Sequence, residues 1–592
     1  MQTHTQPGSV VVDPTENLTS ALWEAERSQP DLAILAHRVG DTFIDVTFAG
    51  MASQVRRIAA GLMALGVQPG DRVAVFSPTR IEFTLIDYAV WAAGAATVTI
   101  YETSAPEQVG WIVTDSGARV IICADAHLES VYRAAGAACE HVLTLDDGGL
   151  DHLLATGAAI TDEEVIQRAA SVAGTDLASL VYTSGTTGKP KGCELTVGSF
   201  VWESRQVAAE IGDVLHEGAV TLMFLPLAHI FARVAQVASI MNRSKIAYST
   251  GIPNLMEELA IVQPTWLFAV PRVFEKVYNS ARSKADAEGK ARIFDLAARV
   301  AGDYSRHSGE GRVPLGTRLG HAVFDRLVYA KLRHALGGRL RYAVSGGAAL
   351  GERLGHFFNG IGITVLEGYG LTENVAVAAF NRPGAVKIGT VGCPVAGSTI
   401  GIADDGEILV AGPHVFRGYW NNPAATAEAI DPEGWLRTGD IGAVDEDGYV
   451  RITGRKKELL VTAGGKNVAP APLEDRLRAH PLLSQVMVVG DGKPYVGALV
   501  TLDPEQAAMW AAAHGKAWSL EALPHDHDLI AEIQQAVDEV NGSVSKAESI
   551  RRFVILDADF TIEEGEMTPT LKVRRNVVAE HFSGEIERLY QS

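Results

Sequence analysis

Short runs rich in β-branched residues alternate with longer amphipathic runs between about residues 22 and 248, and this alternation constrains the fold more than any other feature. One example is the β-rich run 72–76, followed by a helix-like segment at 81–93 and another β-rich run at 96–100. Strands separated by helices of about 10–15 residues predict β-α-β units and a mostly parallel, covered sheet. Similar runs at 266–270 and 341–344 predict a second α/β unit.

The pattern changes after about residue 389. Short strand-like runs at 399–402, 407–410 and 449–452 are separated by turns rich in Asp and Gly, which predict a small antiparallel, barrel-like subdomain. After Gly454-Arg455-Lys456-Lys457-Glu458 the chain has the pattern of a separate α+β region. The sequence therefore predicts an α/β protein whose large N-terminal domain contains two doubly wound α/β subdomains and the β-barrel-like subdomain. The boundaries are 1–454 for this domain, with the barrel-like part at about 389–453, then 455–458 for a hinge and 459–592 for a smaller α+β domain.

Composition places the chain among ordinary globular proteins. Hydrophobic residues make up 47% and charged residues 21%, which excludes a disordered, collagen-like or coiled-coil protein. The formal charge is −20, which argues against a nucleic-acid partner because phosphate affinity depends on concentrated Lys and Arg. No secretory signal is apparent, and the longest apolar stretch is shorter than the roughly 20 residues of a membrane span. We expect a cytoplasmic protein whose membrane contact, where it has one, is peripheral at the inner face of the cell membrane.

One segment departs from the acidic charge. Residues 281–341 contain 13 Lys and Arg against 6 Asp and Glu, a net charge of +7, and their apolar residues have helical spacing. Two interpretations remain open for this basic helical insertion. It is either a solvated helical hairpin or a basic face for anionic lipid headgroups or a polyphosphate ligand.

The sequence that carries most chemistry is the loop from Tyr182 to Gly192, YTSGTTGKPKG, which follows a strand-like run. Its glycines allow backbone N–H groups to turn inward, and its hydroxyl and lysine side chains supply further donors, so the loop suits a polyphosphate. It is not a Walker A loop, because Gly185 and Gly188 are too close together and Pro190 follows Lys189 where Ser or Thr is required.

This loop resembles the phosphate loop of the acyl-adenylate-forming (AMP-binding) superfamily. Further matches follow in the family's order: Ser345-Gly346-Gly347-Ala348-Ala349 is similar to the adenine-pocket turn, Gly368-Tyr369-Gly370-Leu371-Thr372-Glu373 to the core motif, Trp435-Leu436-Arg437-Thr438-Gly439-Asp440 to the ribose motif, Gly454–Glu458 to the hinge and Pro569–Arg575 to the terminal lysine motif. Together the matches extend from about residue 180 to 575.

The resemblance implies a set of nucleotide-binding residues: Thr183, Ser184, Gly185, Thr186, Thr187, Gly188, Lys189, Gly346, Gly347, Ala348, Tyr369, Gly370, Thr372, Asp440, Arg455 and Lys572. It implies catalytic roles for Lys572, Thr186, Glu373 and His229. The residue chemistry agrees, because a tyrosine face suits a purine and an aspartate accepts two hydrogen bonds from a ribose diol. A carboxylate oxygen of Glu373 suits Mg²⁺, with Thr186 as a second candidate ligand. Lys572 is a mobile positive charge that can approach a carboxylate and an α-phosphate.

Two further regions resemble long-chain fatty acid–CoA ligases of bacteria. In the sequence 225–233, His229 matches the histidine that borders the acyl tunnel, whereas some bacterial relatives have a gating Trp at the position that Arg233 occupies here. The stretch 433–474 is similar to the fatty acyl-CoA synthetase signature, with Lys457 at the hinge and Gly464 and Gly465 expected to approach CoA. The 281–341 insertion is similar to the extra helices of long-chain members.

The predicted function is therefore ATP-dependent activation of long-chain fatty acids to acyl-CoA through acyl-AMP, with release of AMP and pyrophosphate. The expected cofactor is Mg²⁺, and the expected partners are a fatty acid, ATP and CoA, with no nucleic acid; a homo-oligomer and peripheral contact with an anionic membrane stay open. The resemblance also implies that the C-terminal domain is mobile and swings about Lys457 between the two half-reactions. The alternatives are a fatty acyl-AMP ligase that delivers the acyl group to a carrier protein and a catalytically silent acyl or nucleotide binder.

Overall fold

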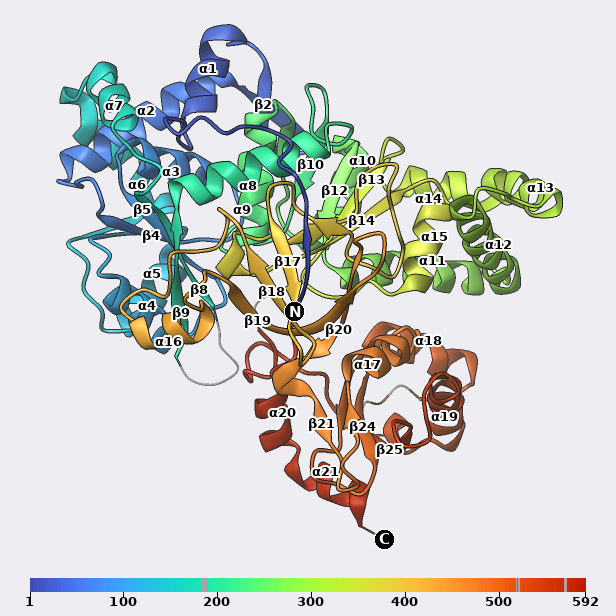
Figure 1. Cartoon of the computed structure of the whole chain (residues 1–592). Coiled ribbons are helices and arrows are strands. Elements are labelled where there is room, and N and C mark those ends of the chain that lie inside the picture. Colours follow the sequence, from blue (N-terminus) through green and yellow to red (C-terminus); the bar gives the residue numbers. More distant parts are fainter. Residues whose placement is uncertain (184–188, 518, 520–521, 569–571, 592) are drawn as a thin grey trace.

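A computed structural model provides the fold of the chain (Figure 1). It describes residues 1–183, 189–517, 519, 522–568 and 572–591. Five residues predicted to bind nucleotide lie outside the described residues: Ser184, Gly185, Thr186, Thr187 and Gly188.

The first α/β unit is a six-stranded sheet in the order β7-β6-β4-β5-β8-β9, parallel except for β9. Its strands are β4 (Arg72–Phe76), β5 (Ala96–Ile100), β6 (Val120–Cys123), β7 (His141–Thr144), β8 (Leu177–Thr183) and β9 (Lys191–Thr196). Alternate side chains of β4 enter different cores: Val73 and Val75 pack with α2 (Phe48–Ala64) and α3 (Ile81–Ala92), whereas Ala74 and Phe76 pack with α4 (Pro106–Ser116) and α5 (Ala126–Ala134). The predicted covered parallel sheet is confirmed. The remaining helices of this part are α1 (Ser20–Ser28), α6 (Gly149–Thr156) and α7 (Asp162–Ala170).

A second α/β layer consists of two further sheets. One has the order β10-β11-β2-β3 and the other β12-β13-β14-β15-β16, and in each the first three strands are parallel. Their strands are β2 (Ala33–Val39), β3 (Thr42–Thr47), β10 (Val220–Met223), β11 (Lys245–Tyr248), β12 (Trp266–Ala269), β13 (Tyr342–Ser345), β14 (Thr364–Tyr369), β15 (Ala379–Phe380) and β16 (Cys393–Pro394). The associated helices are α8 (Val197–Glu210), α9 (Ile230–Met241), α10 (Leu255–Val262) and α15 (Glu352–Gly360).

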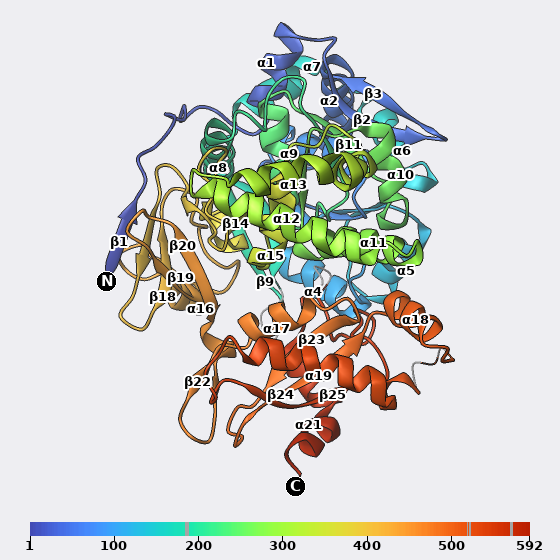
Figure 2. The same ribbon diagram turned by 90° about the vertical axis from the view of Figure 1, so that its right-hand side faces the viewer.

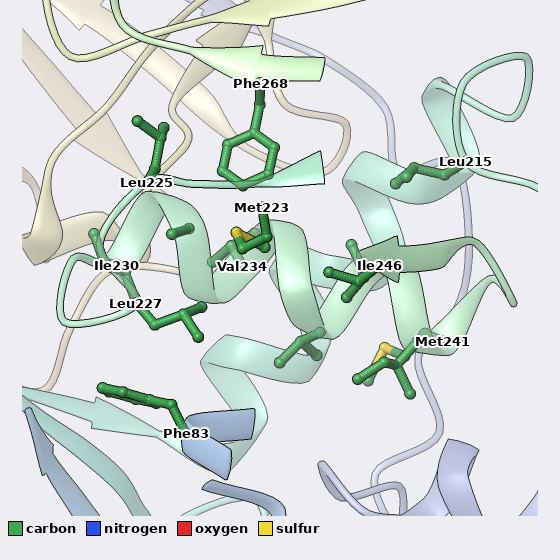
Figure 3. Packing of buried hydrophobic residues seen from close by; sticks show 14 of the residues in the cluster. Phe83, Leu215, Met223, Leu225, Leu227, Ile230, Val234, Met241, Ile246 and Phe268 are labelled. Atoms are coloured by element: carbon green, nitrogen blue, oxygen red, sulfur yellow. The ribbon is translucent and has the colours of Figure 1, made fainter. Parts of the chain in front are cut away.

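Helix α9 lies in the middle of this core. Figure 3 shows side chains from the neighbouring strands and loops around it, with Phe268 on one side of the helix and Phe83 on the other. Because apolar side chains surround α9, its position is determined by packing on several sides.

The antiparallel sheet predicted near residue 389 is present, and two of its strands, at its N-terminal edge and in its interior, were not named by the sequence analysis. Its order is β1-β17-β18-β19-β20, with β1 (Gln2–Thr5), β17 (Thr399–Ile402), β18 (Glu407–Ala411), β19 (Leu436–Val444) and β20 (Val450–Arg455). The N-terminal strand β1 pairs with β17, about 400 residues away in the sequence. Helix α16 (Pro423–Ala429) lies between β18 and β19 in the chain.

The basic segment is helical, as its apolar spacing predicts. It comprises α11 (Pro271–Ala287), α12 (Ala291–Gly309), α13 (Leu315–Phe324), a π-helical turn η4 (Asp325–Tyr329) and α14 (Ala330–Ala335). Figure 1 shows α13 at the outer edge of the molecule. None of the described helices combines the length and the apolar character of a membrane span.

The C-terminal part has its own core on the two faces of a small sheet. The sheet has the order β23-β24-β25, and a separate hairpin pairs β21 with β22. The elements are β21 (Leu460–Val461), β22 (Asn467–Val468), β23 (Leu483–Val489), β24 (Val496–Leu502), β25 (Ile550–Ile555), α17 (Ala471–Arg478), α18 (Pro504–Ala513), α19 (His527–Asn541), α20 (Arg575–His581) and α21 (Ser583–Tyr590). Figures 1 and 2 both show this part beneath the larger N-terminal part.

Candidate active site

A large cleft lies at the carboxyl ends of three strands. Its volume is about 3240 Å³, and its lining includes Thr183 at the end of β8, Gly346 just after β13 and Tyr369 at the end of β14. Residues of the C-terminal part, among them Lys572, close the opposite side. Loops at the carboxyl ends of parallel strands are the usual ligand sites of α/β folds, and here they converge with a second structural unit.

The turn that follows β14 has room only for glycine at Gly370. A Cβ atom added there would lie 1.9 Å from the carbonyl oxygen of Ala376. The turn is closed by the Asn374 side chain, whose Oδ1 accepts a hydrogen bond of 2.6 Å from the Leu371 N–H. Val375 then adopts a left-handed φ of 52°, which costs energy for a β-branched residue. Packing and hydrogen bonds together hold this turn in one conformation.

Thr372 and Glu373 lie on this turn and line the cleft. The hydroxyl of Tyr419 donates a 2.8 Å hydrogen bond to Oε1 of Glu373. The Glu373 side chain accepts no second hydrogen bond from any residue that the structure describes. Within the described part of the chain, Oε2 therefore accepts no hydrogen bond. The sequence analysis missed Tyr419, because its motif neighbours lie about 50 residues away in the chain.

Tyr369, Asp440 and Arg455 form a connected group. The Tyr369 hydroxyl donates to Oδ2 of Asp440 over 2.6 Å, and Arg455 Nε lies 3.0 Å from Oδ1 of the same carboxylate. Asp440 and Arg455 face each other across β19 and β20, which explains their spacing of fifteen residues. Burial and the Asp440 charge raise the pKa of Tyr369 well above its ordinary value, so its hydroxyl remains a hydrogen-bond donor at neutral pH. The structure thus brings three predicted residues together.

Lys572 enters the cleft from the C-terminal part. Its backbone N–H donates to Oγ1 of Thr568 over 3.1 Å. Partial desolvation of its ammonium in the cleft and the positive charge of Arg455 lower the pKa of Lys572, while the carboxylates of Asp440 and Glu373 act in the opposite direction. Arg455 and Asp440 are predicted nucleotide-binding residues, and Glu373 is the predicted metal ligand. The ammonium of Lys572 therefore lies in the electrostatic field of the predicted site.

His229 is the N-cap of α9 and lines the cleft. Its Nδ1 accepts a 3.2 Å hydrogen bond from the Phe231 N–H, so a neutral ring carries its proton on Nε2. Burial and the charge of Lys572 lower the pKa of His229 to about 3. The imidazole is therefore neutral and can donate one hydrogen bond from Nε2.

The phosphate-loop lysines have different surroundings. The ammonium of Lys189 lies 4.2 Å from the centre of the Trp111 ring, and Lys189 does not line the cleft, whereas Lys191 lines it and lies 4.9 Å from the Tyr419 ring centre. The site prediction named Lys189 and omitted Lys191. The predicted turn after β13 does line the cleft, with Gly347 at a left-handed φ of 84°; its members are Gly346, Gly347 and Ala348.

An apolar branch of the cleft follows helix α9 from His229 into the core. Its lining comes from α8 and the loop after it, from one face of α9 and from the strands β12, β13 and β14. These residues are Val207, Ile211, Leu215, Ile230, Phe231, Val234, Ala235, Ala238, Trp266, Phe268, Val344 and Leu366. From His229 to Ala238 the helix rises by roughly 13 Å, so the branch is deep as well as apolar.

Arg233 does not line this branch. Its guanidinium makes two hydrogen bonds to Asp87, with Nη2–Oδ1 at 2.7 Å and Nε–Oδ2 at 3.0 Å, and a third to Ser179. Both side chains of the ion pair are completely buried, and the guanidinium lies 5.5 Å from the centre of the Trp91 ring. At this position the chain has a buried ion pair, not a residue at the cleft surface.

The expected hinge and CoA residues also have definite positions. Lys456 is anchored to the antiparallel sheet by Asp405 at 2.5 Å and Glu407 at 3.0 Å, while Lys457 has no ion pair among the described side chains. Gly464 and Gly465 are exposed in the loop between β21 and β22 and do not line the cleft. The structure therefore has Lys572 inside the cleft and the two glycines outside it.

Helix α11 contacts the C-terminal part directly. Arg272 Nη2 lies 3.2 Å from Oγ of Ser484 and 3.4 Å from Oδ2 of Asp503. Nearby, burial and the charge of Asp475 raise the pKa of Glu367 to about 7. Burial also raises the pKa of Asp475 to about 6. The sequence analysis predicted none of these contacts, because they join segments more than 100 residues apart.

Comparisons with known proteins agree with this geometry. The family model described as AMP-binding enzyme matches residues 22–420, and the model of the AMP-binding enzyme C-terminal domain matches residues 457–592. Among solved structures, the A domain of carboxylic acid reductase from Segniliparus rugosus, in complex with AMP and a co-purified carboxylic acid, has a TM-score of 0.76 at 21% identity over 98% of this chain and 95% of that one. A Mycobacterium tuberculosis fatty acyl CoA synthetase has a TM-score of 0.63 at 24% identity over 97% and 100% of the two chains. These two likenesses establish the fold.

A curated relative extends the match to the whole chain. The long-chain-fatty-acid–CoA ligase FadD15 of Mycobacterium tuberculosis is 50% identical over 592 residues, which cover 99% of this chain and 98% of the relative. The family models, this identity and the convergence of the motif residues on one cleft lead to the same result: the chain belongs to the AMP-binding enzyme family.

Proposed function

We propose that the chain is a long-chain fatty acid–CoA ligase that activates its substrate with ATP and transfers the acyl group to CoA. One observation carries the proposal: a single cleft combines the Tyr369, Asp440 and Arg455 group, the Lys572 ammonium and a deep apolar branch. The full-length identity to FadD15, a protein named for this activity, supports the choice of substrate.

In this proposal the nucleotide occupies the polar end of the cleft. The ring of Tyr369 and the turn at Gly346 and Gly347 take the adenine, while Asp440 and Arg455 hold the ribose. The Asp440 carboxylate is already oriented by two partners, so little side-chain entropy is lost when the sugar binds. The segment 183–191 contacts the phosphates, and Lys191 is the cleft-lining lysine of that segment.

The Glu373 carboxylate is a suitable ligand for the Mg²⁺ that accompanies ATP. One of its oxygens accepts a hydrogen bond from Tyr419 and the other accepts none from the described residues, which is the arrangement expected of a single carboxylate ligand. Mg²⁺ typically keeps several waters and binds through one or two carboxylates together with substrate phosphates. When bound, the ion would offset phosphate charge.

In the first half-reaction, a carboxylate oxygen of the fatty acid attacks the α-phosphorus of ATP. The new C–O–P bond forms as the bond to pyrophosphate breaks, giving acyl-AMP. The neutral His229 can donate from Nε2 to the substrate carboxylate and orient it. Lys572 lies where it can stabilise the negative charge that builds on the α-phosphate during in-line attack.

In the second half-reaction, the CoA thiol attacks the acyl carbonyl, a C–S bond forms and AMP leaves. We propose that the C-terminal domain rotates about Lys457, removes Lys572 and brings Gly464 and Gly465 to the cleft. The observed arrangement supports the first state, with Lys572 inside and the glycines outside. The unanchored Lys457, next to the anchored Lys456, suits a pivot.

The apolar branch leads to a prediction about chain length. Replacement of Ala238 by Phe adds a ring to the face of α9 that lines the branch, so a long acyl chain should no longer fit. We expect kcat/KM for palmitate to fall by about 10–100-fold while octanoate is much less affected. Ala238→Ser, which changes the volume little, is the control. An equal loss with both acids would contradict the assignment of the branch.

Product analysis tests the function itself. The protein is incubated with ATP, Mg²⁺ and palmitate, with and without CoA, and the products are identified by mass spectrometry. We expect palmitoyl-CoA only when CoA is present, with one AMP released per thioester. Accumulation of palmitoyl-AMP that ignores CoA would favour the fatty acyl-AMP ligase and a carrier-protein acceptor. Failure to consume ATP would instead favour a silent binder.

A further inference from the structure

Among the described residues, the four large apolar side chains that are most exposed, apart from two near the N-terminus, lie on one helical surface. Leu315 is 73% exposed, Leu319 62%, Val323 56% and Leu327 54%. The first three are spaced by four residues along α13, so they form a stripe on one face, and Leu327 extends it into η4. Exposed apolar stripes of this kind mark contact sites, whereas single exposed residues do not.

The opposite face of the same segment is firmly attached to the protein. Tyr329 is buried, and its hydroxyl donates to the Ala297 carbonyl oxygen over 2.6 Å. Nε2 of His321 donates a 2.7 Å hydrogen bond to the Gly360 carbonyl oxygen. The His321 ring stacks on that of Tyr304, with the ring centres 3.9 Å apart. The stripe therefore points outward from an anchored helix. Figure 1 shows α13 at the outer edge of the molecule, and Figure 2 shows it on the face formed by α11 and α12.

Unpaired positive charge lies in the same segment as the stripe, with Arg318 on α13 itself and Arg326 on η4. In segment 281–341 four of the six acidic residues are already paired with basic neighbours: Glu288, Asp295, Asp303 and Asp325. Nine basic residues of the segment have no ion pair with any residue that the structure describes: Lys284, Arg292, Arg299, Arg312, Arg318, Arg326, Lys331, Arg339 and Arg341. This is a strong local excess in a chain of net charge −20.

We infer that α13 and η4 form a docking surface for an anionic lipid bilayer, with the stripe of Leu315, Leu319, Val323 and Leu327 inserted between headgroups. An interfacial helix binds by an apolar face in the acyl boundary and by basic residues that contact anionic headgroups, and both are present here. A second copy of the chain fits less well, because a symmetric contact through this face would bring the unpaired arginines of both copies together.

The same segment also borders the cleft. Arg282 and Arg299, on α11 and α12, line it, and α13 packs on α12. A bilayer bound at α13 would therefore hold the cleft close to the surface from which an amphipathic acid would be drawn. The docking surface is inferred independently of the ligase activity, because it depends on exposure and charge alone.

Vesicle co-sedimentation of the full-length protein tests this inference without ATP, CoA or fatty acid. We expect binding to phosphatidylcholine vesicles that contain about one third phosphatidylglycerol, and little binding to phosphatidylcholine alone. The triple variant Leu315→Ser/Leu319→Ser/Val323→Ser should bind the anionic vesicles at least about tenfold more weakly. Its fold should be intact, because no residue of α13 is buried.

A charge variant tests the contribution of the basic residues to vesicle binding separately from that of the apolar stripe. Arg312→Gln/Arg318→Gln/Arg326→Gln should also weaken binding at least about tenfold at low salt, and its difference from the wild type should shrink at high salt. The serine variant should remain weak at every salt concentration. Matched controls are Ile252→Ser/Met256→Ser, which removes exposed apolar side chains elsewhere, and Arg27→Gln/Arg57→Gln, which removes exposed arginines of α1 and α2.

Four results would overturn the inference. The first is sedimentation of the wild type with neither type of vesicle, and the second is binding of the variants as tight as that of the wild type. The third is a wild-type dimer in analytical ultracentrifugation that the serine variant converts to a monomer, which would assign the stripe to a second copy of the chain. Loss of binding in the controls to the same degree would overturn it as well.

Discussion

Replacement of Lys572 by Ala is expected to lower the rate of acyl-AMP formation by about 10²–10³-fold, while conversion of supplied acyl-AMP to the thioester changes far less. The reason is its position. The ammonium lies in the electrostatic field of Arg455, Asp440 and Glu373, where the phosphates of ATP are proposed to bind. An alanine there would leave the charge that develops on the α-phosphate without this stabilisation, and water would substitute poorly.

Two separate assays measure the effect. Pyrophosphate release with ATP and palmitate follows the first half-reaction, and thioester formation from synthetic palmitoyl-AMP and CoA follows the second. Lys546→Ala is a matched control, because Lys546 is an exposed lysine of the C-terminal part with no ion pair to any described residue. Lys572→Arg keeps the positive charge but replaces the compact ammonium by a planar guanidinium. Its rate of acyl-AMP formation should therefore lie between those of the wild type and Lys572→Ala. An equal fall in both half-reactions would reject domain alternation.

The strand positions were predictable because a parallel sheet leaves a strong local pattern. The runs predicted at 72–76 and 96–100 coincide with β4 and β5, since both are short runs rich in β-branched residues with a helical segment between them. Strand β1 could not be predicted, because residues 2–5 are short and polar, and only pairing with the distant β17 makes them a strand. Local sequence thus predicts strands whose own residues have a strong strand pattern. It misses strands that form only by pairing with a distant part of the chain.

The candidate site follows the same rule. Motif residues such as Tyr369, Asp440 and Arg455 converge as predicted, because the ends of their strands meet at one cleft. The predictions chose Lys189 over Lys191, since spacing alone cannot indicate which lysine turns towards Trp111. Similarly, Tyr419 could be identified only from its hydrogen bond to Glu373.

Removal of Asp87 is expected to be the most destabilising single change in the N-terminal part. Asp87→Ala would leave the guanidinium of Arg233 fully buried without its counter-charge, and breaking a buried pair in this way costs about 3–5 kcal/mol. Urea titration should detect the loss through tryptophan fluorescence, because Trp91 lies 5.5 Å from the guanidinium. Glu24→Ala, which breaks the partly exposed pair with Arg243, should change the free energy of unfolding by no more than about 1 kcal/mol.

A double variant separates lost charge from lost packing. Asp87→Leu/Arg233→Met replaces both charged groups by apolar side chains, so no buried charge is left unpaired and most of the lost stability should return. If the double variant is as unstable as Asp87→Ala, hydrogen bonds to Ser179 and Gln236 are the larger contribution.

The same pair has a functional consequence. Arg233 follows His229 by one helical turn on α9, while Val234 and Ala238 on another face of that helix line the apolar branch. The ion pair therefore fixes the orientation of α9 about its own axis, and it also contributes to the stability of the fold. At temperatures where both variants are folded, we expect the double variant to retain activity with octanoate and to lose part of its preference for palmitate, measured as the ratio of the two kcat/KM values. An unchanged ratio would mean that core packing around α9 orients the helix without the pair, as the apolar neighbours on its other sides allow.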